Sequence, residues 1–136
     1  MMIYTRGRYA LRVMIHLGEH VGEGYIPMKE VAEKQGISLK YLERILPVLV
    51  KNGLVEGVHG KGGGYKLCRE PKDYAVGEIL RLTEGDLAPV ACLESCAEPC
   101  GKSSSCKTIK MWSEFYRLTN EYFDGISISD LISEGC

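Results

Sequence analysis

Cysteine spacing is the feature of this sequence with the clearest chemical meaning. Four cysteines fall within fifteen residues: Cys92, Cys96, Cys100 and Cys106. Thiolates bind iron–sulfur clusters and zinc, whereas free thiols have no structural need to crowd together. Three arginines interrupt the first seventeen residues, so a secretory leader is not indicated and a disulfide framework is not expected. The spacing therefore predicts a metal or cluster centre in a cytoplasmic protein.

The spacing alone leaves the identity of the bound group open. Four thiolates suffice for a [2Fe–2S] or a [4Fe–4S] cluster, and three thiolates completed by a carboxylate or histidine would make a more labile site. Zinc is the alternative, although zinc sites usually contain C-x2-C to C-x4-C pairs and the C-x3-C-x3-C-x5-C pattern has no two-residue gap. A bare thiol switch that forms disulfides on oxidation is a third interpretation. A cysteine-based oxidoreductase ranks last, because the chain has no C-x-x-C pair, and we expect no enzyme activity.

The other cysteines and two of the histidines are expected to be structural. Cys68 stands on a predicted strand, where it would be a small buried hydrophobic residue, and Cys136 at the end of the chain would be free. His16 and His20 belong to the first predicted helix, as surface or core residues rather than metal ligands.

Charge is distributed unevenly along the 136 residues, although the net charge is only −1. Residues 1–66 carry ten Lys and Arg against six Asp and Glu, a balance of +4, and residues 67–136 carry seven against twelve, a balance of −5. A basic front half suits a protein that presents one face to a polyanion.

No apolar run approaches the length of about 20 residues that a membrane span requires, so no membrane partner is expected.

Three helices are predicted in the front part of the chain. Residues 9–19 have apolar side chains at helical spacing, and a short helix opens at Pro27 and stops at Gly36. Ser38 then caps a third helix that ends at Asn52-Gly53. The short turn between the last two helices predicts a helix-turn-helix, and Pro47 predicts a bend in the third helix.

Two short strands, residues 54–59 and 65–68, follow the helix-turn-helix. Four glycines in the five residues between them would let this loop lie close against a surface, as the wing of a winged helix does. A short helix is expected over 76–83, a segment without periodicity over 85–105, a long helix over 107–124 and at most a turn over 129–133. The fold class is mainly α with a small β-wing, a winged helix-turn-helix with a long dimerisation helix.

DNA contact is predicted for the start of the third helix and for the wing, because the second helix of a helix-turn-helix enters the major groove and a slim basic loop can enter a minor groove. The candidates in these two elements are Ser38, Leu39, Lys40, Tyr41, Glu43, Arg44, His59 and Lys61, and further phosphate contacts are predicted for Arg6 and Arg8. Arginine can donate two hydrogen bonds to guanine, glutamate can accept from cytosine N4, and the other polar groups suit phosphate oxygens.

The long helix over 107–124 has two apolar seams. One contains Ile109, Trp112, Tyr116, Thr119 and Phe123, and the other contains Met111, Phe115, Leu118 and Tyr122. One seam is enough to dock a helix on its own chain, so the second predicts packing against another subunit in a homodimer.

Four sequence runs together resemble those of a known family: Tyr9-Ala10-Leu11-Arg12, residues 37–43, residues 51–55 and residues 60–65. The chain is similar over nearly its whole length to the IscR-type winged-helix transcriptional regulators, the Rrf-two family. The resemblance implies a homodimer that binds double-stranded operator DNA, and it implies that Glu43 helps to discriminate between operators. It favours a [2Fe–2S] cluster and a role in controlling iron–sulfur cluster biogenesis.

The ligand pattern departs from that of the family members which hold a cluster. Their cysteines are separated by five residues each, which Cys100 and Cys106 match but Cys92 and Cys96 do not. The fourth ligands known in the family, a histidine and an aspartate, are replaced here by Ile109 and Arg8. A four-thiolate set resolves both departures. We expect residues 1–84 to form the DNA-binding domain, 85–106 the cluster-binding loop and 107–136 the dimerisation helix and tail.

Overall fold

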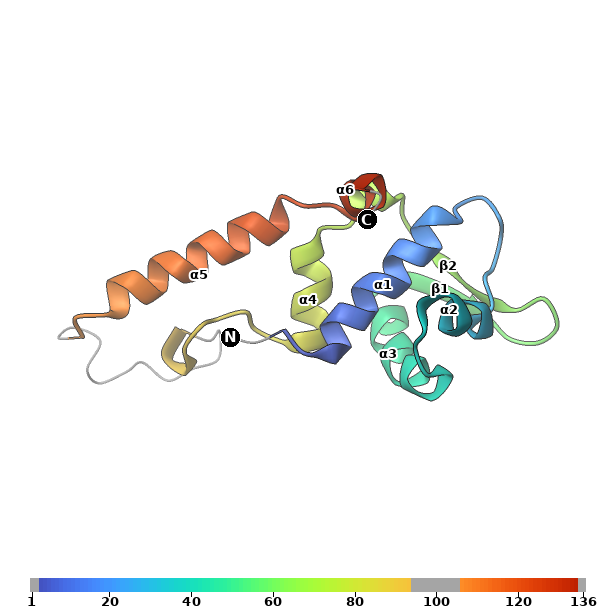
Figure 1. The fold of residues 1–136 in the computed structure, drawn as a ribbon, viewed down its shortest axis with the longest axis horizontal. Helices are drawn as coiled ribbons and strands as arrows, with labels where there is room; N and C mark the ends of the chain where they lie inside the picture. The colour runs from blue at the N-terminus through green and yellow to red at the C-terminus, as the bar shows by residue number, and fades with distance from the viewer. Residues whose placement is uncertain (1–2, 94–105, 135–136) are drawn as a thin grey trace.

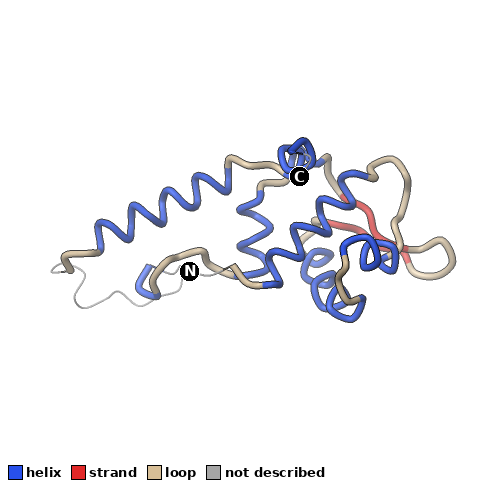
Figure 2. The backbone as a smooth tube through the Cα atoms, viewed as in Figure 1, coloured by secondary structure: helices blue, strands red, loops and turns tan. Residues whose placement is uncertain are grey.

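The computed structural model describes residues 3–93 and 106–134, and its elements follow the predicted winged-helix order (Figures 1 and 2). The α-helices are α1 (Thr5–Glu19), α2 (Met28–Gln35), α3 (Leu39–Lys51), α4 (Val76–Glu84), α5 (Ile109–Asp124) and α6 (Ile128–Glu134). The strands are β1 (Val55–Val58) and β2 (Gly64–Leu67), and the 3-10 turns are η1 (Pro71–Asp73) and η2 (Ala91–Leu93). No helix in the described ranges is long and apolar enough to cross a membrane.

Local sequence signals set the limits of the helix-turn-helix. Gly36 ends α2 in the left-handed conformation, with φ of 65°, which glycine adopts without steric cost. The Ser38 hydroxyl accepts a hydrogen bond from the Tyr41 N–H and caps α3, as predicted. The helix runs through Pro47 without a break.

The wing is an antiparallel pair in which Val55 faces Leu67 and Val58 faces Gly64. A further pairing that the sequence did not predict joins it to the segment before α2. Ile26 donates to the Tyr65 carbonyl across 2.8 Å, and Tyr65 donates to the Ile26 carbonyl across 2.9 Å. Backbone hydrogen bonds therefore fix β2, close to the wing loop, to the segment that leads into α2.

Buried apolar side chains from α1, α2, α3, the wing and α6 form one core. The first predicted helix starts earlier than expected, at Thr5, and packs closely on α4 at Gly7. The Gly7 N–H donates to the Glu84 carboxylate across 2.6 Å, and a Cβ at Gly7 would lie 2.7 Å from Glu84 Cγ. The contact between α1 and α4 thus depends on the absence of a side chain.

The chain end forms a helix, α6, where only a turn was predicted. Ser127 and Asp130 cap it reciprocally, because the Ser127 N–H donates to the Asp130 carboxylate and the Asp130 N–H donates to the Ser127 hydroxyl. Ile128 is fully buried, which places α6 on the core beside α1.

The long helix α5 extends away from the rest of the chain, at the end opposite the wing loop (Figure 1). None of its described residues is buried. The first predicted seam is half-buried and includes Tyr116 and Phe123, which pack on the α4 region. The second seam is exposed: Met111 is 54% accessible, Phe115 45%, Leu118 50% and Tyr122 66%.

Candidate DNA-reading face and cysteine site

The start of α3 presents a polar face to solvent. Lys40, Glu43 and Arg44 are exposed, and within the described part of the chain their side chains have no hydrogen bond or ion pair. Leu39 is 40% exposed beside them. The buried Leu42 and Ile45 point into the core from the opposite face, so the helix is held from behind while its polar side chains stay available.

Two of the predicted contact residues have structural roles at the same helix end. The Ser38 hydroxyl is already occupied as the α3 cap. Tyr41 is half-buried and packs edge-to-face on Tyr9, with ring centroids 5.4 Å apart. The Tyr41 contact anchors the start of α3 to α1, and its ring is less available to DNA than its position in the sequence indicated.

The wing loop exposes His59 and Lys61 between glycines. Its shape requires Gly63 and Gly64. A Cβ at Gly63 would lie 2.3 Å from the Val58 carbonyl oxygen, and one at Gly64, where φ is 156°, would lie 2.4 Å from the Ile26 carbonyl. The glycines therefore make a tight backbone turn that leaves its two basic side chains free. Arg6 and Arg8 are exposed at the start of α1.

Cys106 stands three residues before α5, at its amino end. Its sulfur lies 3.4 Å from the Thr108 hydroxyl oxygen. Hydrogen bonds from the Thr108 hydroxyl, and then from the backbone N–H groups of Thr108 and Ile109, lower the pKa of the Cys106 thiol. A thiolate is the form that binds metals, so this cysteine is suited to be a ligand.

Cys92 is exposed on η2, on the other side of the cysteine-rich segment. Cys96, Cys100 and Cys136 lie outside the described residues. No group of three or more His, Cys, Asp or Glu side chains that could hold a metal is found among residues 3–93 and 106–134. Those ranges contain only the first and last members of the proposed ligand set, Cys92 and Cys106.

The prediction that Cys68 is buried is wrong. Cys68 lies one residue beyond the end of β2 and is exposed. Partial desolvation and the nearby Glu56 raise the pKa of its thiol, which makes it a poorer nucleophile and ligand than Cys106.

Polar contacts attach α5 to the segment that leads into the cysteines. The Tyr116 hydroxyl donates to Asp86 across 2.6 Å. Arg81 on α4 donates to the Asn120 side-chain oxygen across 2.8 Å and pairs with Asp124 at 2.9 Å. The two ends of the cysteine-rich segment are therefore joined to the same pair of helices, α4 and α5.

Comparison with known protein families gives a match over almost the whole chain. Residues 3–134 match the model of the Rrf2 family, described as iron-dependent transcriptional regulators. The chain belongs to the Rrf2 family. Its resemblance to IscR-type regulators is confirmed, as are the predicted fold class and a role in transcriptional regulation through DNA.

Rrf2 relatives match almost the whole chain. The regulator named IscR from Aliivibrio salmonicida is 35% identical over 132 residues, which is 97% of this chain and 77% of that protein. The structure of CymR, the global cysteine regulator of B. subtilis, has a TM-score of 0.80 at 34% identity and covers 98% of both chains. The structure of T. potens IscR has a TM-score of 0.76 at 33% identity, covering 100% of this chain and 89% of that one.

Proposed function

We propose that this Rrf2 protein binds operator DNA as a homodimer, and that a cysteine-ligated iron–sulfur cluster modulates its affinity to control cluster biogenesis. The observation that carries the proposal is the position of the Cys106 sulfur, 3.4 Å from the Thr108 hydroxyl at the amino end of the helix with the exposed apolar seam. The names of the IscR relatives support the same function.

Four thiols are the proposed ligands: Cys92, Cys96, Cys100 and Cys106. When bound, a cluster would supply iron–thiolate bonds that close residues 92–106 into a loop, and [2Fe–2S] is favoured over [4Fe–4S]. Thr108 fits this role because its hydroxyl stabilises the deprotonated sulfur of Cys106.

The chain's own contacts offer a route from that loop to the DNA-reading face. A bound cluster would constrain Asp86, which precedes the cysteines, and α5, which follows them. The hydrogen bond from Tyr116 on α5 to Asp86 already joins these two parts of the chain. Arg81 connects α5 to α4, and α4 packs on α1 at Gly7. A change in the orientation of α5 would therefore change the distance between the DNA-binding domains of the two subunits, and so the operator that binds best.

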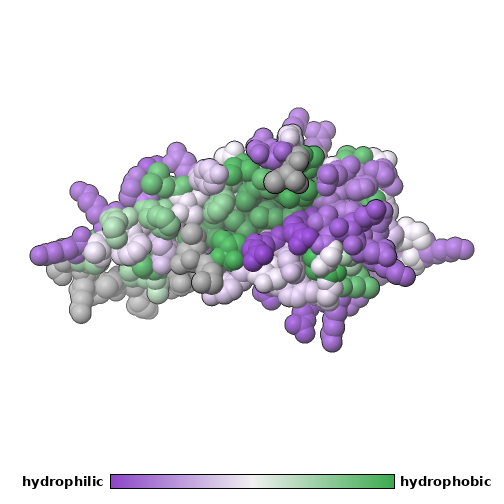
Figure 3. All heavy atoms as spheres, in the orientation of Figure 1, coloured by the Kyte–Doolittle hydropathy of each residue, from purple (hydrophilic) through white to green (hydrophobic). Residues whose placement is uncertain are grey.

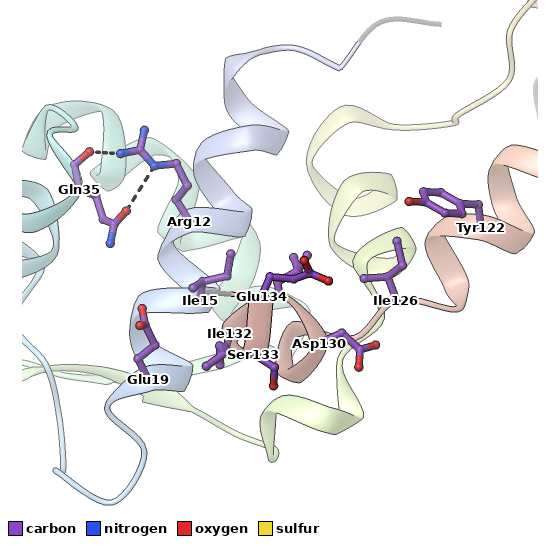
Figure 4. A pocket seen from close by; sticks show the side chains of 11 residues that line it. Arg12, Ile15, Glu19, Gln35, Tyr122, Ile126, Asp130, Ile132, Ser133 and Glu134 are labelled. Atoms are coloured by element: carbon purple, nitrogen blue, oxygen red, sulfur yellow. Dashed lines mark hydrogen bonds between the residues drawn. The ribbon is translucent and has the colours of Figure 1, made fainter. Parts of the chain in front are cut away.

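A second copy of the chain is the proposed occupant of the exposed α5 seam. Tyr122, at the end of this seam, also lines an open hollow of about 1150 Å³ between α1, α6 and the end of α5 (Figure 4). Ile15, Ile126 and Ile132 line the same hollow. Figure 3 shows hydrophobic atoms gathered over the middle of this face. Charged side chains, among them Arg12 and Asp130, also line the hollow, so it is the exposed apolar seam of α5 that is typical of a subunit interface.

Anaerobic purification followed by absorption spectroscopy and iron and sulfide assays tests the cluster. We expect visible absorbance with iron and sulfide in equal amounts, and operator affinity that differs between loaded and cluster-free protein. Colourless protein that cannot be reconstituted, yet binds operator DNA, would contradict the proposed cluster and support a DNA-binding regulator without one.

A thiol-switch regulator is the second candidate, and the similarity to CymR favours it. The chain is 30% identical to the S. aureus CymR whose structure is of an oxidized form, with a TM-score of 0.74. In that case, oxidant would change operator affinity in metal-free protein, and dithiothreitol would reverse the change. Zinc without iron in the metal assay would instead indicate a zinc-stabilised regulator.

A further inference from the structure

Two side chains of α1 hold the turn between α2 and the reading helix α3. The last residue of α2, Gln35, leads into Gly36 and the cap Ser38. Arg12 donates from its guanidinium to the backbone carbonyl of Gln35 and, across 3.3 Å, to the Gln35 side-chain oxygen. Figure 4 shows these bonds as dashed lines. His16, one turn further along α1, contacts the same glutamine through its ring nitrogen Nδ1 at 3.2 Å.

The donors in this chain of contacts fix the position of the His16 proton. A guanidinium can only donate, so Arg12 takes the Gln35 oxygen and leaves the Gln35 amide nitrogen facing His16. Nδ1 of His16 must then accept, and the proton of the neutral ring is on Nε2. Nε2 is buried and has no hydrogen-bond partner in the described part of the chain, and the His16 side chain is only 3% exposed.

A second proton on the His16 ring cannot be accommodated without breaking this arrangement. Protonated Nδ1 would place an N–H donor against the Gln35 amide, which is also a donor. It would also place a charge on a buried ring that stacks on His20, with centroids 4.5 Å apart. The hydrogen bond from the Gln35 amide to His16 therefore exists only while His16 is neutral.

The surroundings of His16 favour the neutral ring. Burial is the largest cause that lowers the pKa of His16 below 6.5, and His20 is the next. Glu30 on α2 and Glu19 on α1 oppose this shift, whereas Lys34 on α2 adds to it. His20 itself donates from Nδ1 to the His16 carbonyl across 2.8 Å, which keeps the two rings stacked.

We propose that neutral His16 is a positioning residue for DNA binding, because it locks the α2–α3 turn through Gln35, and that its protonation releases the turn. The DNA part of this inference rests on the proposed function, whereas the proton-dependent lock does not. Because the unfolded chain takes up this proton at about pH 6.5 and the folded chain only below that, stability is lost as pH falls from 6.5 toward the lower pKa of the folded state.

The test compares pH profiles of operator affinity in variants of the full-length protein. The chain has three histidines, so His59→Ala removes the one on the wing and leaves the pair on α1. In that background we expect affinity for a specific operator duplex to fall once the pH drops below the lowered pKa of His16 in the folded protein, by up to about tenfold per pH unit, the limit for one linked proton. Adding His16→Asn, whose side-chain oxygen can accept from Gln35 but does not titrate, should flatten the profile.

His20→Asn is the matched control, because it removes the stacked ring and keeps the lock. Since His20 lowers the pKa of His16, we expect the fall in affinity to remain and to begin at higher pH. Equal pH profiles for the His59→Ala protein and its His16→Asn derivative would overturn the proposal.

NMR gives a readout that needs neither DNA nor a folded His16 variant. Ring nitrogen shifts of His16 in the native chain should show the proton on Nε2 at pH 7.5, and the Gln35 side-chain amide and the Gly36 backbone amide should shift together with His16 ionisation. A proton on Nδ1, or turn amides that do not respond, would contradict the lock. Failure to bind any operator, with the NMR result intact, would instead count against the proposed function and the positioning role.

Discussion

The hydroxyl of Tyr74 donates a hydrogen bond to the backbone carbonyl of Leu54 across 2.6 Å, in a fully buried position. The same hydroxyl accepts from the Arg69 N–H across 2.9 Å. Leu54 directly precedes β1 and Arg69 follows β2, so one side chain joins both ends of the wing. The Tyr74 carbonyl accepts from Ile128, which links this junction to α6.

Replacing Tyr74 with Phe should destabilise the fold by about 1–3 kcal/mol, because it leaves the Arg69 N–H without its partner and removes the shorter of two hydrogen bonds to the Leu54 carbonyl. Urea denaturation followed by circular dichroism measures the change. Tyr25→Phe is the control, since the Tyr25 hydroxyl makes only an exposed 3.5 Å bond to Glu56. Equal effects of the two substitutions would contradict this role for Tyr74.

Substituting Gly64 with Ala should cost more stability than substituting Gly60 with Ala. Both glycines have positive φ, and that strain costs about 1–3 kcal/mol at either position. Only at Gly64 would the added Cβ also meet backbone, 2.4 Å from the Ile26 carbonyl, whereas no atom lies within 4 Å at Gly60. Thermal melting of the two variants side by side checks the order, and a larger loss at Gly60 would contradict the wing geometry.

Cys106→Ala should abolish the visible absorbance of anaerobically purified protein, because it removes the thiol whose pKa Thr108 lowers. Cys68→Ala is the matched control, since that thiol is exposed on the wing with a raised pKa and should be dispensable. Iron and sulfide content is the second measurement. Absorbance that survives loss of Cys106 would exclude it as a required ligand.

Lys61→Ala should weaken operator binding and reduce the slope of log affinity against log salt by about 1, as expected for one lost phosphate contact. Fluorescence anisotropy titrations between 50 and 200 mM salt, about the range in which such slopes are measured, give this value. Lys72→Ala on η1 is the control, because Lys72 is paired with Glu70 away from the wing. Identical slopes for native protein and Lys61→Ala would show that Lys61 does not contact a phosphate.

Leu118→Lys should shift the protein from dimer to monomer, because it places a charge at the centre of the exposed α5 seam, where Leu118 is 50% accessible in the single chain. Sedimentation velocity over a range of concentrations measures the shift. Ser113→Lys, which adds a charge at an exposed position on the side of the same helix away from this seam, should leave the association unchanged. A Leu118→Lys protein that remains dimeric would place the interface elsewhere.

Sequence reasoning identified the helix-turn-helix and wing because their signals are local. Ser38, Gly36 and the glycine run specify caps and turns within a few residues, so the predicted limits agree with the structure to within a few positions. The two α5 seams were equally readable, because a helix of this length repeats its pattern often enough to separate two faces.

Features that depend on distant partners were missed. Ile26 pairs with Tyr65, and Tyr74 bonds Leu54, across separations that no local pattern reveals. The α6 helix is too short for periodicity, yet Ser127 and Asp130 have the spacing of a capping box, a signal that the sequence contains. Cys68 was predicted to be buried because it was assigned to the second strand, which in the structure ends one residue earlier, at Leu67.

The close approach of α1 to α4 limits how these helices can move. With only a hydrogen at Gly7 and the Glu84 carboxylate bonded to its N–H, the two helices leave no room for a side chain between them at this point. A displacement of α4 would therefore act directly on α1, whose Arg12 and Tyr9 side chains contact Gln35 and Tyr41 on either side of the turn before α3.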